Sequence, residues 1–207
     1  MCQGQSSKLH KGIPIIETKR LKLRNFKIDD ANEYYYYHMD SDTLRFYDWK
    51  PESISDAEVD IEGIIRDYEN LNRIHWAITL KDNDTIIGDI GILIDSFGFK
   101  GEINYMLSKY YWGMGIMSEV LSSVISFIFR ETELIRIQAL SVPENQPSGN
   151  LLKRTGFNSE GLLKKYGHNT ITNQPIDLTM WSLLKSEYKS LSPSKSPSAQ
   201  SNIQIVP

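Results

Sequence analysis

The sequence predicts a single mixed α/β (α+β) domain, in which a central sheet of about seven strands is covered by about four helices. The first observation is length, since 207 residues accommodate one domain with tails and suffice to bury a full core. The second is the order of the apolar patterns along the chain. One strand, two helices, three strands, a helix, a strand, a helix and two strands follow one another, which is typical of a mixed sheet covered by helices.

The first third of the chain contains one predicted strand and two predicted helices. Apolar and polar residues alternate over residues 16–26, which predicts a strand. A short helix is expected over residues 29–38, where two aspartates lie near its positively polarised start. Ser55 or Asp56 can cap a second helix, which runs to about residue 70 and repeats its isoleucines on one face.

The middle of the chain predicts three consecutive strands and a third helix. Residues 74–80 and 86–94 flank a segment rich in Asp and Asn that suits a hairpin turn, and a third strand occupies residues 102–107. The apolar residues of 118–130 recur at helical spacing. We expect this helix to contribute a nearly complete stripe of core residues.

The last part of the domain predicts three strands and one short helix. The strands are expected at residues 134–142, 157–163 and 176–184, and the helix at residues 148–154. This helix is expected to end at Gly156, because glycine readily adopts the left-handed conformation of a C-terminal cap.

The two ends of the chain differ in composition from its middle. We expect residues 1–12 to form a flexible polar segment and residues 13–189 to form the domain. Residues 190–207 are rich in Ser and Pro and lack an apolar period until their last few positions. They are therefore expected to form a disordered tail.

Composition limits the class of function and the compartment. The net charge of −3, without a dense block of Lys and Arg, argues against a protein that binds nucleic acid. Cys2 is the single cysteine, so we expect no internal disulfide, no metal site built from thiols, and a reducing cytoplasm as the compartment. No run of about eighteen apolar residues occurs, so we expect no membrane partner and no export.

A glycine turn between the strand at 102–107 and the long helix is the strongest chemical signal. Gly113 and Gly115 allow backbone conformations that a Cβ hinders, and they let a ligand approach the main chain. The start of the following helix presents N–H groups without intrahelical partners, which favour a bound anion. Alone the pattern is weak evidence, because such turns often only connect a strand to a helix.

The sequence around this turn resembles the GNAT superfamily of acetyl-CoA-dependent N-acetyltransferases, and within it the RimJ/RimL type. Residues 112–119, Trp-Gly-Met-Gly-Ile-Met-Ser-Glu, are similar to the Trp-Gly-x-Gly-Tyr-x-x-Glu of that type. Four further matches follow in register: Arg-Ile-x-Ala at 136–139, Asn-x-x-Ser at 145–148, Gly-Phe at 156–157 and Glu-Gly at 160–161. The resemblance extends over roughly residues 16–188 and implies the acyl-CoA N-acyltransferase fold, with a mostly antiparallel sheet.

The resemblance implies a binding site for acetyl-CoA and no metal. In the family the pyrophosphate of CoA lies on the N–H groups of the glycine turn, which here are those of Gly113, Met114, Gly115, Ile116 and Met117. Leu107 would offer backbone groups to the pantetheine arm, provided that its strand splays from the neighbouring strand at 137–142. Asn145 would contact the pantetheine or only shape its loop. Lys153 and Arg154 would meet the nucleotide phosphates or only form a solvated helix face.

Acyl transfer to an amine requires a group that protonates the departing thiolate. The resemblance implies Ser148 in this role, because the family places a serine near the sulfur. Many relatives instead use a tyrosine one helical turn later, but here Leu151 and Leu152 occupy that region. The alternative is that Ser148 only caps its helix.

The base that removes the proton of the amine is open between two residues. Glu102 lies on the strand that leads into the turn, where members of the superfamily often place a carboxylate, although it can equally be a surface charge. A glutamate proposed in RimL-type proteins corresponds here to Gly167, and the adjacent His168 is the second candidate. An α-amine has a pKa of about 8 and needs less help from a base than a lysine, near 10.4.

The acceptor amine is expected to bind between the first two helices and the loop near Tyr166. Tyr37, Tyr47 and Trp49 are the candidates for the pocket wall, although buried aromatic residues more often only pack in a core. Three aspartates of the same segment would attract a cationic amine or are merely solvated: Asp40, Asp42 and Asp48.

These observations predict an N-acetyltransferase that transfers the acetyl group of acetyl-CoA to a primary amine by direct attack in a ternary complex. The acceptor is expected to be a protein or peptide N-terminus. Two alternatives stay open: a small amine such as a polyamine, antibiotic or toxin as the acceptor, or a noncatalytic module that binds acyl-CoA. The chain is expected to be a monomer or a homodimer.

Overall fold

A computed structural model of the chain describes residues 13–47, 49–69, 72–191 and 203–204. The segment 1–12 and most of the tail 190–207, for which flexibility was predicted, lie outside these residues. Within the described part, no helix is long and apolar enough to cross a membrane.

The described residues form nine strands that belong to one sheet. Their bounds are β1 Ile15–Glu17, β2 Leu21–Arg24, β3 Arg73–Leu80, β4 Ile86–Ile94, β5 Lys100–Leu107, β6 Arg136–Ser141, β7 Asn158–Asn169, β8 Gln174–Leu184 and β9 Ile203–Gln204. The helices are η2 Ile28–Asp30, α1 Ala31–Met39, α2 Ser41–Leu44, α3 Ile54–Asp67, η3 Lys109–Tyr111, α4 Ile116–Glu131, α5 Gln146–Arg154 and α6 Lys185–Leu191, with η marking 3₁₀ turns.

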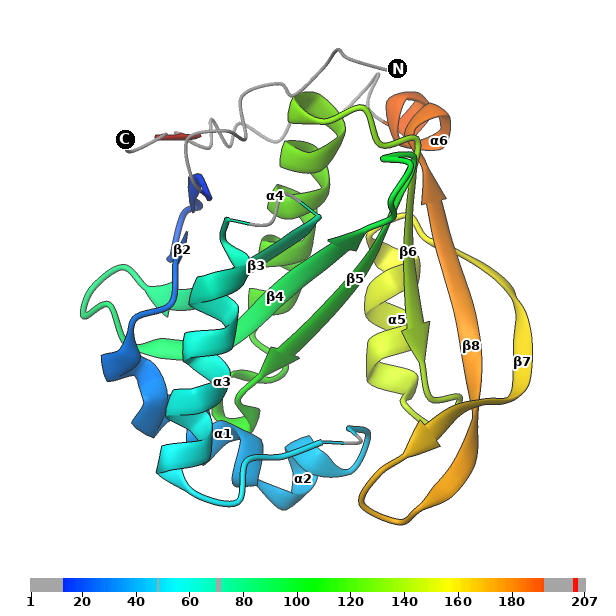
Figure 1. Cartoon of the computed structure of the whole chain (residues 1–207). Helices are drawn as coiled ribbons and strands as arrows, with labels where there is room; N and C mark the ends of the chain where they lie inside the picture. Colours follow the sequence, from blue (N-terminus) through cyan, green and yellow to red (C-terminus); the bar gives the residue numbers. More distant parts are fainter. Residues whose placement is uncertain (1–12, 48, 70–71, 192–202, 205–207) are drawn as a thin grey trace.

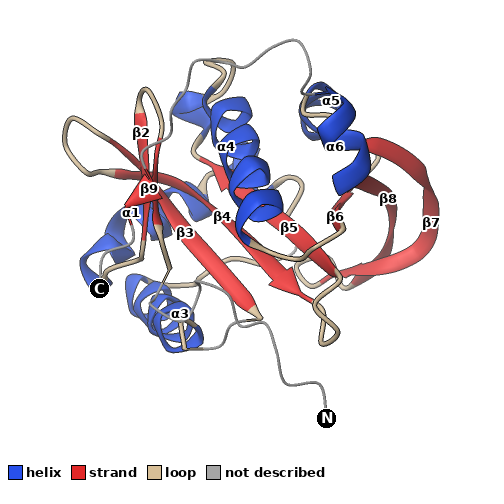
Figure 2. Cartoon of the chain, turned by 90° about the horizontal axis from the view of Figure 1, so that it is seen from above, coloured by secondary structure: helices blue, strands red, loops and turns tan. Residues whose placement is uncertain are grey.

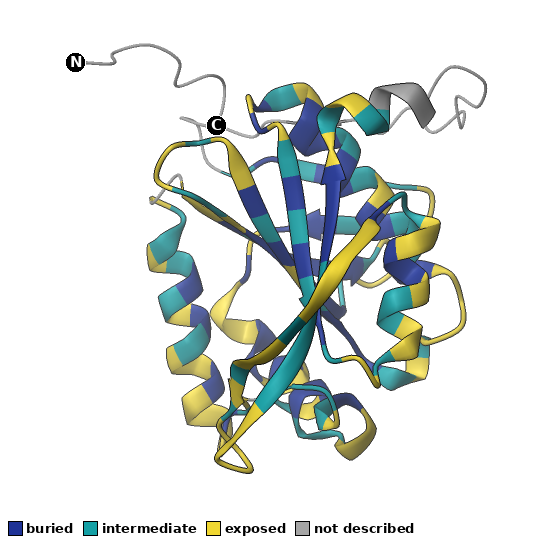
Figure 3. Ribbon diagram, turned by 90° about the vertical axis from the view of Figure 1, so that its right-hand side faces the viewer, coloured by how far each residue is buried: buried dark blue, intermediate teal, exposed yellow. Residues whose placement is uncertain are grey.

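The sheet has the strand order β7-β8-β6-β5-β4-β3-β2-β1-β9, and among these neighbours only β5 and β6 run parallel. Helices α4 and α5 cover one face of the sheet, and α1 and α3 cover the other (Figures 1 and 2). The prediction of an α+β domain with a mostly antiparallel sheet is therefore confirmed. The β7–β8 hairpin extends the sheet on the far side of β6, and its outer strand β7 is largely exposed (Figure 3).

Three local predictions were wrong or incomplete. The alternation over residues 16–26 belongs to two short antiparallel strands, β1 and β2, because Thr18 accepts the N–H of Leu21 and turns the chain between them. The cap of α3 is Ser53 rather than Ser55 or Asp56, since its hydroxyl accepts the N–H of Asp56 at 3.1 Å. The short helices α2, η3 and α6 were not predicted, because their few residues give no apolar period.

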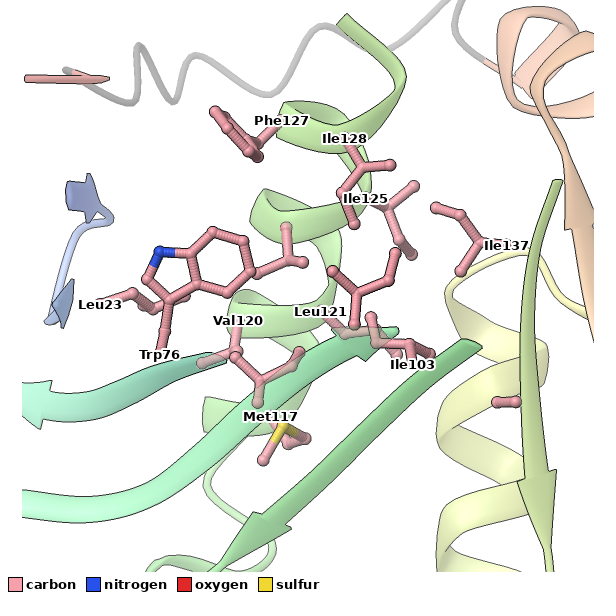
Figure 4. Packing of buried hydrophobic residues seen from close by; sticks show 14 of the residues in the cluster. Leu23, Trp76, Ile103, Met117, Val120, Leu121, Ile125, Phe127, Ile128 and Ile137 are labelled. Carbon is pink, nitrogen blue, oxygen red and sulfur yellow. The ribbon is translucent and has the colours of Figure 1, made fainter. Parts of the chain in front are cut away.

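The main core lies between the sheet and α4. Trp76 is fully buried against this helix, and its ring meets Phe127 edge to face with centroids 5.9 Å apart. Val120, Leu121 and Ile128 project from the same face of α4 toward the strands (Figure 4). A second cluster of buried residues joins α1 and α3 to the opposite face of the sheet. The sheet is thus fixed on both faces at β3 and β4, which gives the adjacent site a rigid base.

The parallel strands β5 and β6 diverge. Register pairs join them only from Lys100 opposite Arg136 to Glu102 opposite Gln138. Beyond this point the two strands separate, as Figure 1 shows toward the carboxyl end of β5. The splay on which the role of Leu107 depends is therefore present, and the carboxyl half of β5 faces a gap instead of a neighbouring strand.

Candidate active site

Two cavities lie at the gap between β5 and β6. The larger cavity, of about 530 Å³, is lined by the glycine turn, the start of α4 and one side of α5, including Gly113, Met117 and Arg154. The smaller cavity, of about 240 Å³, is lined by parts of β5, β6, β7 and β8, including Gly167 and His168.

The glycine turn has the backbone conformation that its sequence predicts. Gly113 and Gly115 have φ angles of +74° and +72°, in the left-handed region that side chains with a Cβ disfavour. Gly115 is the residue that precedes α4, and no side chain caps the first N–H groups of this helix. Those N–H groups and the helix dipole can therefore stabilise an anion at the mouth of the larger cavity.

Arg20, which sequence reasoning missed, braces this turn. Its Nε donates to the Glu119 carboxylate at 2.8 Å and its Nη1 donates to the Met114 carbonyl at 2.9 Å. The backbone N–H of Arg20 donates to the same carboxylate at 3.1 Å. β2 is thereby tied to both the turn and the first turn of α4. Glu119 was recognised only as part of a motif, and the sequence carries no signal that pairs it with Arg20.

Leu107 directs its backbone groups into the gap. Ser108 donates its N–H to the Ile87 carbonyl at 2.8 Å, so Gly88 and Leu107 form a non-hydrogen-bonded pair of the antiparallel ladder. The N–H and C=O of Leu107 therefore point away from β4 and toward β6. The indole Nε1 of Trp112 donates to this carbonyl at 2.7 Å, a contact that was not predicted. The N–H of Leu107 is oriented toward a ligand that would lie along the strand.

A common wall separates the two cavities. The residues that line both are Phe46, Tyr47, Tyr105, Asn145 and Ser148. The hydroxyl of Tyr47 donates to the Tyr105 carbonyl, which fixes the unpaired segment after α2 against β5. The two cavities therefore adjoin at these shared residues.

The hydroxyls of Tyr105 and Ser148 are hydrogen-bonded at 2.9 Å. Asn145, not Ser148, caps α5, because its Oδ1 accepts the N–H of Ser148 at 3.1 Å. The alternative that Ser148 serves only as the cap is therefore wrong, and its hydroxyl is directed to the wall. Burial raises the pKa of Tyr105 to about 12, although the hydrogen bond with Ser148 opposes this shift. Tyr105 was missed, but its position between Ile103 and Leu107 on one strand face could have indicated it.

His168 lies on the wall of the smaller cavity, and its Nε2 is 3.1 Å from Oδ1 of Asn173. A bulge in β7 shifts the register between Leu163 and Gly167 and brings Gly167 and His168 to the cavity. A Cβ on Gly167 would lie 2.9 Å from Leu178 Cδ1. A side chain at position 167, where RimL-type proteins have a glutamate, would therefore require the Leu178 side chain to shift, whereas position 168 holds a histidine.

The other proposed base, Glu102, lies away from the common wall. Its carboxylate accepts a hydrogen bond from Gln138 Nε2 at 2.8 Å, at the point where β5 and β6 are still paired. Glu102 lines neither cavity, and it is separated from Tyr105 by roughly 10 Å along the strand.

Several predicted binding residues also lie outside both cavities. Tyr37 is buried and donates to Asp89 at 2.9 Å, and Trp49 meets His38 edge to face at 5.7 Å. Tyr166 is exposed on the bulge of β7. Only Tyr47, among the four predicted acceptor residues, lines a cavity.

On the cofactor side, Met114 and Lys153 do not line the larger cavity. Met114 is exposed and contributes its carbonyl to Arg20, while Lys153 Nζ lies 5.7 Å from the centroid of the Trp181 ring. Leu107, Asn145 and Arg154, with the other residues of the turn, do line it. The larger cavity therefore combines backbone donors with one described cation.

Two of the three aspartates that were expected to attract a cation are paired with a lysine. Asp40 and Asp42 both form ion pairs with Lys109, and the hydrogen bond from Lys109 lowers the pKa of Asp40. Asp40 also caps α2 by accepting the N–H groups of Asp42 and Thr43. Asp48 lies outside the described residues. Two of the three carboxylates that were expected to attract a cationic amine are therefore held in ion pairs with Lys109.

The two cavities differ in charge. Among the described residues that line the smaller cavity there is no Asp, Glu, Lys or Arg. The larger cavity has Arg154 on its wall and the N-terminus of α4 at its mouth. This set of groups suits a phosphate-bearing ligand in the larger cavity and an uncharged group in the smaller one.

Comparison with known proteins agrees with this geometry. Residues 20–158 match the model of the acetyltransferase (GNAT) domain. The chain is 34% identical over 175 residues to the uncharacterized N-acetyltransferase p20 of Bacillus licheniformis, a match that covers 83% of this chain and 96% of that protein. It is 38% identical over 64 residues to the ribosomal protein uS5 alanine N-acetyltransferase of Escherichia coli, covering 31% and 33% of the two chains.

Among solved structures, the Mycobacterium smegmatis RimJ in complex with a CoA disulfide superimposes with a TM-score of 0.73. The sequence identity is 20%, and the match covers 84% of this chain and 91% of that chain. At this identity the likeness concerns the fold.

Proposed function

The chain belongs to the GNAT family of acetyltransferases and is an acetyl-CoA-dependent N-acetyltransferase, and we propose that its acceptor is the N-terminal α-amine of a protein or peptide. We further propose that the acetyl group passes directly from acetyl-CoA to this amine in a ternary complex. The proposal assigns acetyl-CoA to the larger cavity and the acceptor amine to the smaller cavity.

Acetyl-CoA fits the larger cavity. The open backbone at Gly113, where no atom lies within 4 Å of an added Cβ, leaves room for a pyrophosphate against the N–H groups of the turn. The N–H of Leu107 is oriented to pair with the pantetheine arm, and Arg154 supplies a cation for a phosphate. The thioester supplies an activated acetyl group, and the residues of the chain hold and orient it.

The common wall is the observation that supports direct transfer. A thioester in the larger cavity and an amine in the smaller cavity would approach each other beside Ser148 and Tyr105. Transfer between two such sites needs no covalent enzyme intermediate, since both substrates are held at the same time. The predicted kinetic pattern is sequential.

The lack of Asp, Glu, Lys and Arg among the described residues that line the smaller cavity favours an α-amine. Polyamines and aminoglycosides carry several positive charges, which need carboxylates to compensate for lost solvation. None of the described residues that line this cavity carries one. An α-amine has a pKa of about 8, so a large fraction is neutral near this pH and can enter without a counter-ion. The E. coli relative, which is named as an enzyme for a ribosomal protein, supports a protein acceptor.

His168 is the proposed base and Ser148 the group nearest the departing sulfur. His168 lies on the acceptor side of the wall, where it can take the proton that the amine loses when the new bond forms. Ser148 lies at the wall itself. Glu102, the other candidate base, would have to act through water because it lines neither cavity.

The test is a CoA-release assay with three groups of amines at equal concentration. We expect turnover with short peptides that have a free N-terminus and none with the same peptides after N-terminal blocking. Spermidine and kanamycin serve as the multiply charged comparison. Preference for either of these over every peptide would contradict the proposed acceptor, while parallel lines in a double-reciprocal plot would contradict direct transfer.

The noncatalytic alternative has one supporting observation, which is the glycine at position 167. Isothermal titration with acetyl-CoA separates the two functions. Binding of acetyl-CoA without CoA release for any amine would favour a binding module, whereas peptide-dependent CoA release would exclude it.

A further inference from the structure

Tyr105 is part of the common wall between the cavities. It lines both of them, and its hydroxyl is 2.9 Å from that of Ser148. It projects from β5, whereas Ser148 is in the first turn of α5, so two separate elements bring the hydroxyls together.

We propose that Tyr105 is the proton donor for the departing thiolate and that Ser148 relays this proton to the sulfur. The inference rests on the proposed function in one respect, namely that an amine in the smaller cavity attacks a thioester in the larger one. It assigns to the enzyme a general acid from β5 in addition to the serine on α5.

A serine alone is a weak acid for this step. An aliphatic hydroxyl is far less acidic than a phenol, whose ordinary pKa is about 10. Burial raises the pKa of Tyr105 to about 12, so the phenol stays protonated near pH 8, where an α-amine becomes neutral. A hydrogen-bonded phenol therefore makes proton donation by Ser148 less costly, and it restores the serine hydroxyl in the same step.

The position of Tyr105 is fixed by its neighbours. It pairs with Ile90 in the ladder between β4 and β5, and its carbonyl accepts the Tyr47 hydroxyl. Ser148 is held in turn by the cap from Asn145 to its N–H at 3.1 Å. The two hydroxyls are therefore placed before any substrate binds, as electrostatic preorganisation requires.

In the proposed step the nitrogen of the amine forms a bond to the carbonyl carbon, and the C–S bond breaks with its electron pair remaining on sulfur. Ser148 gives its proton to sulfur and receives the proton of Tyr105, while His168 takes the proton that the amine nitrogen loses. The phenolate then regains a proton from water, and His168 releases its proton to solvent.

The first test compares Tyr105→Phe, Ser148→Ala and the double variant, with Tyr36→Phe as the matched control. Tyr36 is exposed on α1 and lines neither cavity. We expect each single variant to lower kcat by about 10²-fold or more, with KM for acetyl-CoA within threefold of wild type. Because the hydroxyls act in one relay, the double variant should be no slower than the slower single variant. Multiplicative losses in the double variant, or unchanged kcat in Tyr105→Phe, would overturn the relay.

The second test keeps the hydroxyl and changes only its acidity. Incorporation of 3-fluorotyrosine and then 3,5-difluorotyrosine at position 105 makes the phenol progressively more acidic with little change of shape. We expect kcat with a slow acceptor to rise along this series, with unchanged melting temperature. A kcat that does not depend on the phenol would leave Tyr105 a packing residue and contradict the proposal.

Both tests use whichever amine the wild-type enzyme acetylates, which keeps the two proposals separate. If peptides are not acetylated but another amine is, the acceptor proposed above is wrong, and the series at position 105 still decides the role of Tyr105. If peptides are acetylated and the series is flat, only the relay fails.

Discussion

At the scale of single residues, the site depends on a few backbone and side-chain positions that the sequence marks unequally. Gly113 and Gly115 were identified because glycines allow backbone conformations that a Cβ hinders and because the surrounding residues resemble a known family, and the φ angles agree. Tyr105 was missed, because a strand residue becomes catalytic only through a partner that is distant in sequence. Ser148 is 43 positions away, and no periodicity relates the two.

Arg20 is predicted to act on donor binding. Arg20→Ala removes the hydrogen bonds to Glu119 and to the Met114 carbonyl, so the glycine turn loses its brace. We expect KM for acetyl-CoA to rise about tenfold, equivalent to about 1.4 kcal/mol, with little change in kcat. Steady-state kinetics with varied acetyl-CoA checks this. Lys19→Ala, which removes an adjacent exposed charge, is the control and should leave KM unchanged.

His168 is predicted to act on the chemical step. His168→Gln retains hydrogen bonding at the cavity wall but removes the group that takes the proton, so kcat should fall about 10²-fold at pH 7. The loss should persist as the pH rises toward 9, because the proton that His168 takes leaves the nitrogen only when the new bond forms, even when the amine is neutral as it binds. Glu102→Gln is the matched comparison, and a larger loss in this variant than in His168→Gln would reverse the assignment.

At the scale of elements, the strands and long helices follow from local patterns, whereas their meeting points do not. Helix α4 was predicted from its apolar spacing, and its face toward Trp76 is buried as expected. The bulge that brings His168 to the cavity was not predicted, because it results from the pairing of β7 with β8 and from Lys165 in a left-handed conformation. Short helices such as α2 are set by a cap and by Lys109 instead of by periodicity.

A buried ion-pair cluster at β2 is predicted to be essential for stability. Arg24 is buried and donates to both oxygens of Asp30 at 2.8 Å, and its Nε donates to Asp84 at 2.9 Å. Arg24→Met leaves the buried Asp30 carboxylate without its cation. We expect the free energy of unfolding to fall by about 3–5 kcal/mol, measured by urea denaturation. Lys22→Met on the same strand serves as control, and an equal loss there would contradict the role of the cluster.

At the scale of the whole molecule, β5 and β6 diverge, and two cavities lie in the gap between them. The two cavities share one wall, which is built by β5, α5 and the segment after α2. The order of elements could be predicted from the sequence, since it follows from the apolar patterns, whereas the splay could not, because it depends on where the pairing of β5 with β6 ends. Which residues line both cavities could not, because it depends on side chains from β5, α5 and the segment after α2 together.

Stability of the whole domain is predicted to fall in acid partly through Asp84. Burial by itself would raise the pKa of Asp84, but hydrogen bonds from Lys27 and Arg24 outweigh this effect and lower the pKa to about 2. The pKa in the folded state is depressed below the unfolded value near 3.9, so the stabilisation is present above about pH 4 and is lost as the pH falls toward 2. Because the side chain is partly exposed, we expect about 1 kcal/mol after solvent screening.

Comparison of Asp84→Asn with wild type by thermal unfolding between pH 7 and pH 2 measures this contribution. The variant should be less stable at neutral pH, and the difference should shrink as the pH falls below about 4. A constant difference across this range would show that the ionisation of Asp84 contributes nothing.

The central claim is that donor and acceptor occupy separate cavities and meet at the wall formed by Tyr105 and Ser148. A crystal structure with a bisubstrate analogue, in which the sulfur of CoA is joined through an acetyl linker to a peptide N-terminus, tests it most directly. We predict that the pyrophosphate lies on the N–H groups of residues 113–117, the sulfur lies beside Ser148, and the peptide end enters the smaller cavity near His168. A peptide end that extends from the sulfur but lies outside the smaller cavity would contradict this claim.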